Sequence, residues 1–387
     1  MPNLTELQTV ELDLLRRFTE VAELECLSWF AMFGTLLGAV RHGGFIPWDD
    51  DIDVVLPRAD YDRLRNSPDW FAEPYFLQTP ANDPAAAPPF TRLRHSGTTV
   101  LIDFPNGLTR GGNMGAYIDI IPLDDVPDGE TAAGMQKAAE AMRGQLLASA
   151  ALDECAGGAV SAEKEFFCYC SGGIAGGYAA LAERYERFCA RYAGTKQPYC
   201  AMPVCRGERG ARVYEKAWFG GFEPKKFGDL TVRVPIGWEK ALVAAYPGGT
   251  LTPEPKYRTP KHTENAVVDM SRPYTHYTRR YFGMLSGIEG KNVYIFGAGD
   301  SLRIWLERYG AGLNVVCAFD NSERKRGTSA CGIPVRGPDE LPGLLRSDGG
   351  ARLIIASVHY EEISKQLDTI GVTGYFVFID GLRYERG

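Results

Sequence analysis

The sequence predicts an α/β protein made of two domains, residues 1–288 and 289–387. Three observations support this fold class. The chain has 387 residues, enough for more than one hydrophobic core. Its first part mixes helical patterns with short apolar runs, which is typical of an α+β domain. After a composition break at residues 287–291, apolar strands alternate with helices, and this alternation predicts a small parallel sheet.

The overall composition indicates a globular protein and argues against one class of partner. Hydrophobic residues make up 45% of the chain and charged residues 24%, as in soluble globular proteins. The formal net charge of -7 argues against nucleic acid as a partner. There is no leader pattern and no apolar run of about 18 residues, so we expect a cytoplasmic protein without a transmembrane segment.

The nine cysteines are predicted to be reduced thiols. Their number is odd and they lack the paired C-x-x-C spacing of a zinc site. A metal site built from Cys168, Cys170, Cys200 and Cys205 is the alternative. Free cysteines are far more often small core residues, so we assign no ligand to them.

The elements of the first domain follow from local patterns. Apolar residues at helical spacing predict an amphipathic helix over residues 4–25, and the apolar run at 26–34 predicts a buried strand. A second helix begins at Gly34 and Thr35. Further strands are expected at 52–57 and in "GAYIDIIPLDDVP", which contains Asp119, and helices should fill roughly 131–193.

Four aspartates crowd the start of the strand at 52–57, in "DDDID". Alternation along a strand turns Asp51 and Asp53 to the same side, roughly 6 to 7 Å apart. Two such carboxylates can converge on Mg²⁺, which prefers oxygen ligands. Asp119 lies between two isoleucines and is a third candidate from another strand. The alternatives are a solvated acidic loop for the run and an ion pair with an arginine for Asp119.

A Gly-Thr helix start, a strand bearing D-x-D and a later strand with aspartate between apolar residues form the pattern of the nucleotidyltransferase fold. More closely, "GTLLGAVRHGGFIPWDDDID" resembles the LicD family of phosphocholine transferases, together with fukutin-related protein. The resemblance extends through "YIDIIPLDDVP" and, more loosely, to "YPGGTLTPEPKYRTPKH". It covers about residues 5–265.

This resemblance implies a catalytic domain that transfers a phospho-alcohol group, such as phosphocholine, from a CDP-linked donor to a hydroxyl of a cell-surface glycan and releases CMP, with Mg²⁺ or Mn²⁺. It implies metal ligation by Asp51, Asp53 and the neighbouring Asp49, and catalysis by Asp51, Asp53 and Asp119. The candidate substrate contacts are Gly34, Thr35, Arg41, Arg92, Arg94 and His262. Two rivals are a nucleotidyltransferase that releases pyrophosphate from a nucleoside triphosphate and a non-catalytic nucleotide-binding protein.

The second domain carries part of a dinucleotide-binding pattern. Gly297 and Gly299 lie between a predicted strand and helix, and Asp320 ends the next strand, as in Rossmann-like units. Leu302 replaces the third glycine. We therefore expect an accessory domain that binds a nucleotide-sugar or contacts a partner subunit in a homo-oligomer. An NAD-dependent oxidoreductase is the remaining alternative.

Overall fold

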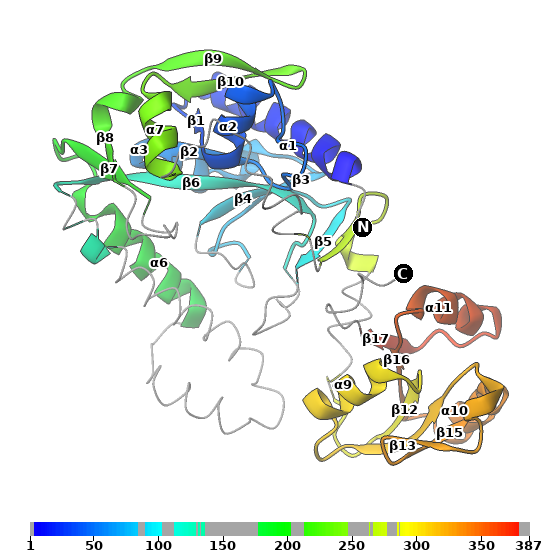
Figure 1. The fold of residues 1–387 in the computed structure, drawn as a ribbon. Coiled ribbons are helices and arrows are strands. Elements are labelled where there is room, and N and C mark those ends of the chain that lie inside the picture. The colour runs from blue at the N-terminus through cyan, green and yellow to red at the C-terminus, as the bar shows by residue number, and fades with distance from the viewer. Residues whose placement is uncertain are drawn as a thin grey trace. The chain divides into compact units, whose positions relative to one another are not determined.

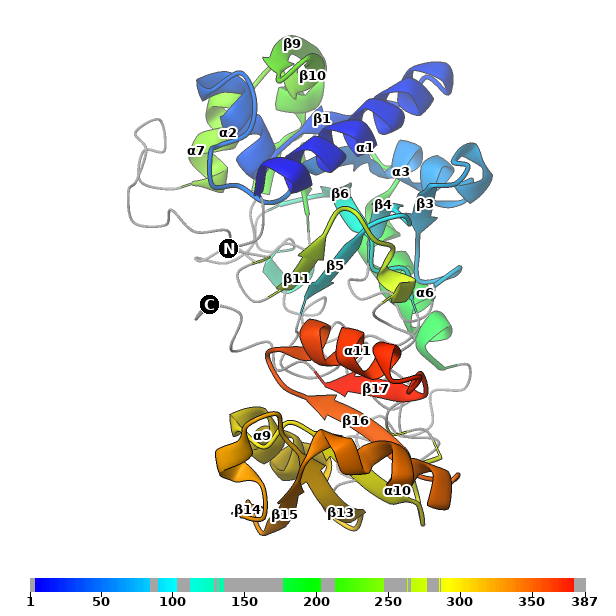
Figure 2. The ribbon, with the colours of Figure 1, turned by 90° about the vertical axis from the view of Figure 1, so that its right-hand side faces the viewer.

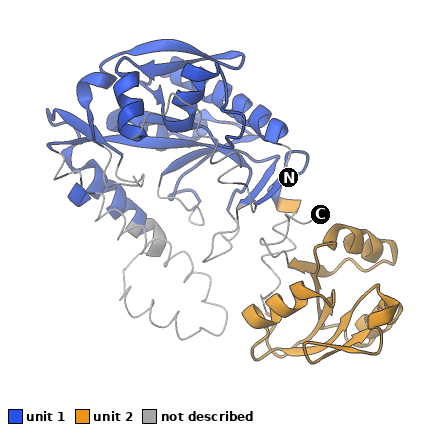
Figure 3. Ribbon diagram, in the orientation of Figure 1, with its two compact units in different colours: residues 1–274 blue, residues 275–387 orange. Residues whose placement is uncertain are grey.

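The computed structural model describes residues 4–83, 90–102, 112–128, 131, 133–135, 177–202, 213–246, 263, 266–276, 285 and 287–378. The chain divides into two compact units, residues 1–274 and 275–387 (Figure 3). Both combine helices and strands, which confirms the predicted α/β class. The predicted boundary at 288/289 stays a prediction, although Ile288 is buried in the core of the second unit.

Unit 1 is built on a mixed sheet (Figure 1). Its helices are α1 (Leu4–Leu24), α2 (Phe33–Arg41), α3 (Arg58–Arg65), α6 (Gly177–Cys189) and α7 (Trp238–Ala245). Its strands are β1 (Phe30–Ala31), β2 (Asp53–Pro57), β3 (Tyr75–Gln78), β4 (Thr91–His95), β5 (Thr99–Ile102), β6 (Ala116–Val126), β7 (Tyr199–Ala201), β8 (Val213–Glu215), β9 (Phe222–Phe227), β10 (Leu230–Pro235) and β11 (Ala266–Asp269). Short 3₁₀ turns lie at Pro68–Trp70, Ala190–Tyr192 and Lys216–Phe219.

The main sheet runs in the order β1, β2, β6, β4, β3, and β7 and β8 extend it beside β6. Strand β2 is parallel to β6 and antiparallel to β1, and β4 is antiparallel to β6. Separate two-stranded sheets pair β9 with β10 and β5 with β11. In both views the β9–β10 hairpin lies beside α2 (Figures 1 and 2). The strands that carry the predicted site residues are therefore neighbours at the centre of the sheet.

Helix α1 confirms the amphipathic prediction, because its leucines at positions 7, 14 and 15 and Phe18 are buried. The strand predicted at 26–34 is wrong in length, since only two residues pair with β2. The reason is local: Phe33 adopts a positive φ of 49° and already begins α2, so the extended run ends before it.

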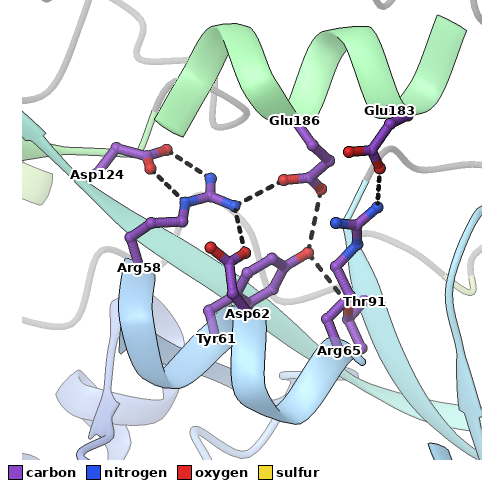
Figure 4. Close-up of polar contacts among 8 residues, drawn as sticks. All are labelled: Arg58, Tyr61, Asp62, Arg65, Thr91, Asp124, Glu183 and Glu186. Carbon is purple, nitrogen blue, oxygen red and sulfur yellow. Dashed lines mark hydrogen bonds and ion pairs between the residues drawn. The ribbon is translucent and has the colours of Figure 1, made fainter. Parts of the chain in front are cut away.

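A buried polar cluster joins α3, β6 and α6 (Figure 4). The Arg58 guanidinium donates Nε to Asp124 Oδ1 at 2.6 Å and Nη2 to Asp124 Oδ2 at 2.9 Å. Its Nη1 also donates to Glu186 Oε2 at 2.7 Å, and Tyr61 donates its hydroxyl to Glu186. All three charged side chains are buried, so Arg58 supplies the positive charge that the two carboxylates share away from water.

Unit 2 confirms the predicted parallel sheet. Its helices are α9 (Asp300–Tyr309), α10 (Leu341–Ser347) and α11 (Tyr360–Thr369), with 3₁₀ turns at Glu323–Lys325 and Pro338–Glu340. Its strands are β12 (Asn292–Phe296), β13 (Asn314–Phe319), β14 (Ser329–Ala330), β15 (Ile333–Arg336), β16 (Arg352–Ala356) and β17 (Tyr375–Phe378). The order is β14, β15, β13, β12, β16, β17, with all pairs parallel except β14 with β15. Without β14, the parallel strands numbered along the chain run 3-2-1-4-5, which is the Rossmann order short of its sixth strand, and β14 is added at the edge beside β15.

Five cysteines lie in the described ranges, and all are free thiols, as predicted. Cys200 is among them and is buried, whereas Cys168, Cys170 and Cys205 fall outside the described residues. Within the part of the chain that the structure covers, no helix combines the length and the apolar character needed to cross a bilayer.

Candidate functional site

Three charged residues form a row across the centre of the unit 1 sheet. The register pairs Asp53 of β2 with Asp119 of β6, and Asp119 in turn with Arg92 of β4. Arg92 donates Nε to Asp119 Oδ1 at 2.6 Å. The Asp119 backbone N–H also donates to Ile52 O at 2.8 Å, which holds the two aspartate-bearing strands together. The sheet thus brings together two of the predicted carboxylates and gives one of them the arginine partner weighed above.

Two residues at the start of α2 contact Asp53 and the loop before it. Thr35 is buried, and its Oγ1 accepts the backbone N–H of Asp53 at 2.9 Å. Gly34 lies directly against the Asp49 carboxylate, so a Cβ at this position would collide with Asp49 Oδ2. The two residues predicted to contact phosphate therefore contact the aspartates in the structure.

Asp49, Asp50 and Asp51 form an acidic loop just before β2. One carboxylate oxygen from each lies within 4.8 Å of the others, so the three could hold a metal ion. Asp50 is buried, and its Oδ2 accepts the backbone N–H of Thr263 at 2.7 Å and the Thr263 hydroxyl at 2.6 Å. The sequence analysis missed this anchoring role of Asp50. Asp53 is not a member of this group, and it lies beside Asp119 on the neighbouring strand.

The site gathers several carboxylates, and their charges act on one another. Burial raises the pKa of Asp53 well above its ordinary value, and the charges of Asp51, Asp119 and Asp49 raise it further, while Arg92 opposes them. The charge of Asp49 also acts on the pKa of Arg41, at the end of α2. Partial burial lowers the Arg41 pKa, and the Tyr246 and Asp49 charges act in the opposite direction. For Asp53, burial and the repulsion from the other aspartates thus outweigh the compensation by Arg92.

Glu11 is a further carboxylate that the sequence analysis missed. It projects from α1, is 2% exposed and feels the charges of the acidic loop. Burial raises its pKa well above the ordinary value, followed by the effects of Asp51, Asp50 and Asp49. A signal was present, because Glu11 falls on the apolar face of α1 between Leu7 and Leu14. An acidic residue on a core-facing stripe is unusual without a partner or function.

Arg92 and Arg94 both stack on Tyr117, with their guanidinium carbons 3.8 Å and 4.8 Å from the ring centroid. Arg94 is buried and donates to Gln78 Oε1 at 2.5 Å and to Gly115 O at 2.7 Å. Burial, assisted by the Arg92 charge, lowers the Arg94 pKa to about 9. Arg92 therefore lies in the aspartate row, whereas Arg94 lies beside it and donates to Gln78 and Gly115. His262 lies outside the described residues.

Residues 27–79 match the family profile described as LicD/FKTN/FKRP, nucleotidyltransferase domain. The predicted LicD resemblance is confirmed over this segment. The lipopolysaccharide cholinephosphotransferase LicD of Haemophilus influenzae is 47% identical to the chain over 70 residues. That match covers 18% of this chain and 26% of the relative, so the chain spans about a quarter of the length of the curated relative it matches. The LicD segment, residues 27–79, contains α2, the acidic loop and β2.

Two solved structures are similar to parts of the chain, each with a TM-score of 0.20. One is UDP-D-quinovosamine 4-dehydrogenase from Vibrio fischeri, at 21% identity, covering 22% of this chain and 75% of that one. The other is RSP in complex with beta-NADH, at 15% identity, covering 28% of this chain and 55% of that one. The segment that matches the family profile, residues 27–79, lies within unit 1.

The candidate nucleotide residues of unit 2 have internal partners. Asp320 accepts the backbone N–H groups of Ala298 and Ser322 and the Lys325 ammonium. Gly297 has a φ of 119° and lies against Ala356 O, where no side chain would fit. Leu302, in place of a third glycine, is fully buried in the core. Nucleotide binding by Gly297, Gly299 and Asp320 stays a prediction.

Proposed function

We propose that unit 1 transfers a phospho-alcohol group, phosphocholine or a similar one, from a CDP-linked donor to a hydroxyl of a cell-surface glycan and releases CMP. The observation that carries this proposal is the acidic loop and Asp53, which lie on the segment that matches LicD, with Asp119 of β6 directly beside Asp53. The name of the Haemophilus relative, a lipopolysaccharide cholinephosphotransferase, supports the group transferred and the acceptor class.

The donor set fits a divalent cation such as Mg²⁺ or Mn²⁺. Carboxylate oxygens are the ligands both ions prefer, and Asp49, Asp50 and Asp51 offer three of them within 4.8 Å of one another. A diphosphate would also be repelled by this many carboxylates unless positive charge lay between them. A bound cation would neutralise the donor diphosphate and stabilise the leaving CMP. Asp51 and Asp49 would hold the cation, Asp50 would fix the loop through Thr263, and Asp53 would add negative charge from β2.

The remaining residues have distinct proposed roles. The acceptor hydroxyl attacks the phosphorus that carries the alcohol group, a new phosphodiester bond forms, and the bond from that phosphorus to the oxygen shared with CMP breaks. Asp119 orients the hydroxyl and receives its proton, while Arg92 holds the Asp119 carboxylate in place at 2.6 Å. Arg41 lies on the Asp49 side and is the candidate to contact a donor phosphate oxygen.

The test is to incubate the protein with a panel of CDP-linked alcohols, a glycan extract and MgCl₂ or MnCl₂, and to follow phosphorus signals by NMR. We expect CMP to appear together with a phosphodiester on the glycan, and both signals to disappear when a chelator is added. Asp53→Asn should reduce product formation to background while the variant stays folded, because this change relieves charge repulsion.

A parallel reaction with CTP separates the rival enzyme class. Pyrophosphate formed from CTP while every CDP-linked donor stays intact would contradict the transferase proposal and favour a nucleotidyltransferase. Binding of cytidine nucleotides without turnover of any of them would favour a non-catalytic nucleotide-binding protein.

A further inference from the structure

The Glu11 side chain is buried without a visible reason within unit 1. Its Oε2 is inaccessible to solvent and has no hydrogen-bond partner among the described residues. Ionised carboxylates in such positions are strongly unfavourable unless a cation or a donor compensates them. The described contacts supply neither for this oxygen, so without a ligand the carboxyl has a raised pKa, and a bound cation would allow it to ionise.

Helix α1 points Glu11 toward the acidic loop. One turn earlier on the same helix, Gln8 donates Nε2 to the backbone carbonyl of Asp49 at 2.8 Å. Residues three apart lie on one face of a helix, so Glu11 is next to Gln8 and faces the same loop. The charges that act on Glu11 come from Asp51, Asp50, Asp49 and Asp119, with Asp51 the strongest. Both observations place Glu11 beside the acidic loop.

We infer that Glu11 supplies a ligand oxygen from α1 to the divalent-cation site of the acidic loop. This inference rests on the proposed metal dependence of the site. It accounts for the presence of an acidic residue on the core-facing stripe of α1. It also gives α1, which lies outside the LicD segment at residues 27–79, a direct part in the proposed site.

The experiment measures Mn²⁺ binding to the full chain by calorimetry and by the electron paramagnetic resonance signal of free Mn²⁺. Glu11→Gln keeps the size of the side chain but removes its charge. We expect Mn²⁺ affinity to fall by about tenfold or more, as for groups that tune a metal site. Without metal, the melting temperature of this variant should equal or exceed that of the unmodified chain, because the change removes a carboxyl whose ionised form is disfavoured by burial and by the nearby aspartates. Glu23→Gln is the matched control, since Glu23 is an exposed residue of the same helix.

The outcomes distinguish the inference from the proposed function. Mn²⁺ bound equally by the unmodified chain and by Glu11→Gln would overturn the role of Glu11 alone. A chain that binds no Mn²⁺ at all would overturn both the role of Glu11 and the metal dependence. If Glu11→Gln does not fold, Glu11→Asp preserves the charge but withdraws it by one methylene, and the inference requires a folded protein with weakened Mn²⁺ binding. Unchanged affinity in Glu11→Asp would count against it.

Discussion

The hydroxyl of Thr35 forms a hydrogen bond with the backbone of Asp53, the first residue of β2. Its Oγ1 accepts the backbone N–H of Asp53 at a buried position, so this hydrogen bond links the start of α2 to the start of the aspartate row. Thr35→Val keeps the shape of the side chain but leaves that N–H without its acceptor. We expect a loss of about 1–3 kcal/mol in the free energy of unfolding, the usual cost of an unpaired buried donor. Urea unfolding measures it.

Thr35→Ser is the control for this prediction, because it retains the hydroxyl and loses only a methyl group. The serine variant should keep most of the product formation measured with CDP-linked donors, and the valine variant should lose most of it. Equal stability and equal activity in the two variants would show that the Thr35 hydroxyl does not hold Asp53.

At the residue scale the sequence predicted the site in part. The spacing of Asp51 and Asp53 and the isolated position of Asp119 indicated carboxylates that meet, and the register indeed places Asp53 beside Asp119. The Asp50 anchor and the buried Glu11 were missed. Asp50 binds Thr263, and the charges that act on Glu11 come from the acidic loop, so both relations join segments far apart in sequence. Residue spacing reports only local geometry, so it marks Glu11 as an acidic residue on an apolar stripe but does not show what either residue faces.

The elements around α3 depend on the buried arginine shown in Figure 4. Arg58 is the shared partner of Asp124 on β6 and Glu186 on α6. Arg58→Ala leaves two carboxylates buried without this counter-charge, and we expect a loss of about 3–5 kcal/mol in stability. Arg63→Ala on the same helix is the control. Its ion pair with Asp60 is half exposed, so the expected loss is about 1 kcal/mol or less. Comparable losses in the two variants would contradict the role of the cluster.

The turn between β12 and α9 in unit 2 depends on the charge of Asp320. Partial burial raises the pKa of this carboxyl, but the Lys325 ammonium and the N–H groups of Ser322 and Ala298 outweigh burial and lower it overall. A carboxyl with a lowered pKa in the folded state stabilises the fold above its unfolded pKa of about 3.9, and this stability is lost as pH falls through the folded value. Unit 2 should therefore open more readily in acid.

Amide hydrogen exchange across residues 292–309 of the full chain measures this effect. Asp320→Asn should raise exchange at about pH 7 and weaken the dependence of local stability on pH below about 4. Asp339→Asn is the control, because the Asp339 side chain is 72% exposed. A pH dependence that is the same in both variants would show that the Asp320 charge does not stabilise the turn.

At the element scale the sequence was more successful in unit 2 than in unit 1. Alternating strands and helices with buried apolar runs, such as 292–296 and 352–356, gave the parallel sheet directly. In unit 1 the strands β3, β4 and β5 fall in a region whose Pro-rich and polar composition gave no such signal. Their pairing depends on contacts with β6 and β11, which are tertiary and leave little local pattern.

The whole chain is expected to behave as two folding units. Because its own sheet and core lie within 1–274, a fragment of residues 1–274 should fold alone and keep the stabilisation by Mn²⁺. Thermal melting followed by circular dichroism, with and without MnCl₂, measures this. The fragment of residues 275–387 is the control and should show no shift with Mn²⁺. A 1–274 fragment without a cooperative transition would mean that unit 1 requires unit 2.

The contact between Asp50 and Thr263 has a consequence for how the protein is made. The two residues are 213 positions apart, and a ribosome builds the chain from its N-terminus. The four aspartates emerge early, but the residue that anchors Asp50 emerges only after most of unit 1 has been synthesised. A nascent chain therefore carries a charged, incompletely anchored loop until late in translation. The acidic loop should therefore reach its final arrangement among the last parts of unit 1.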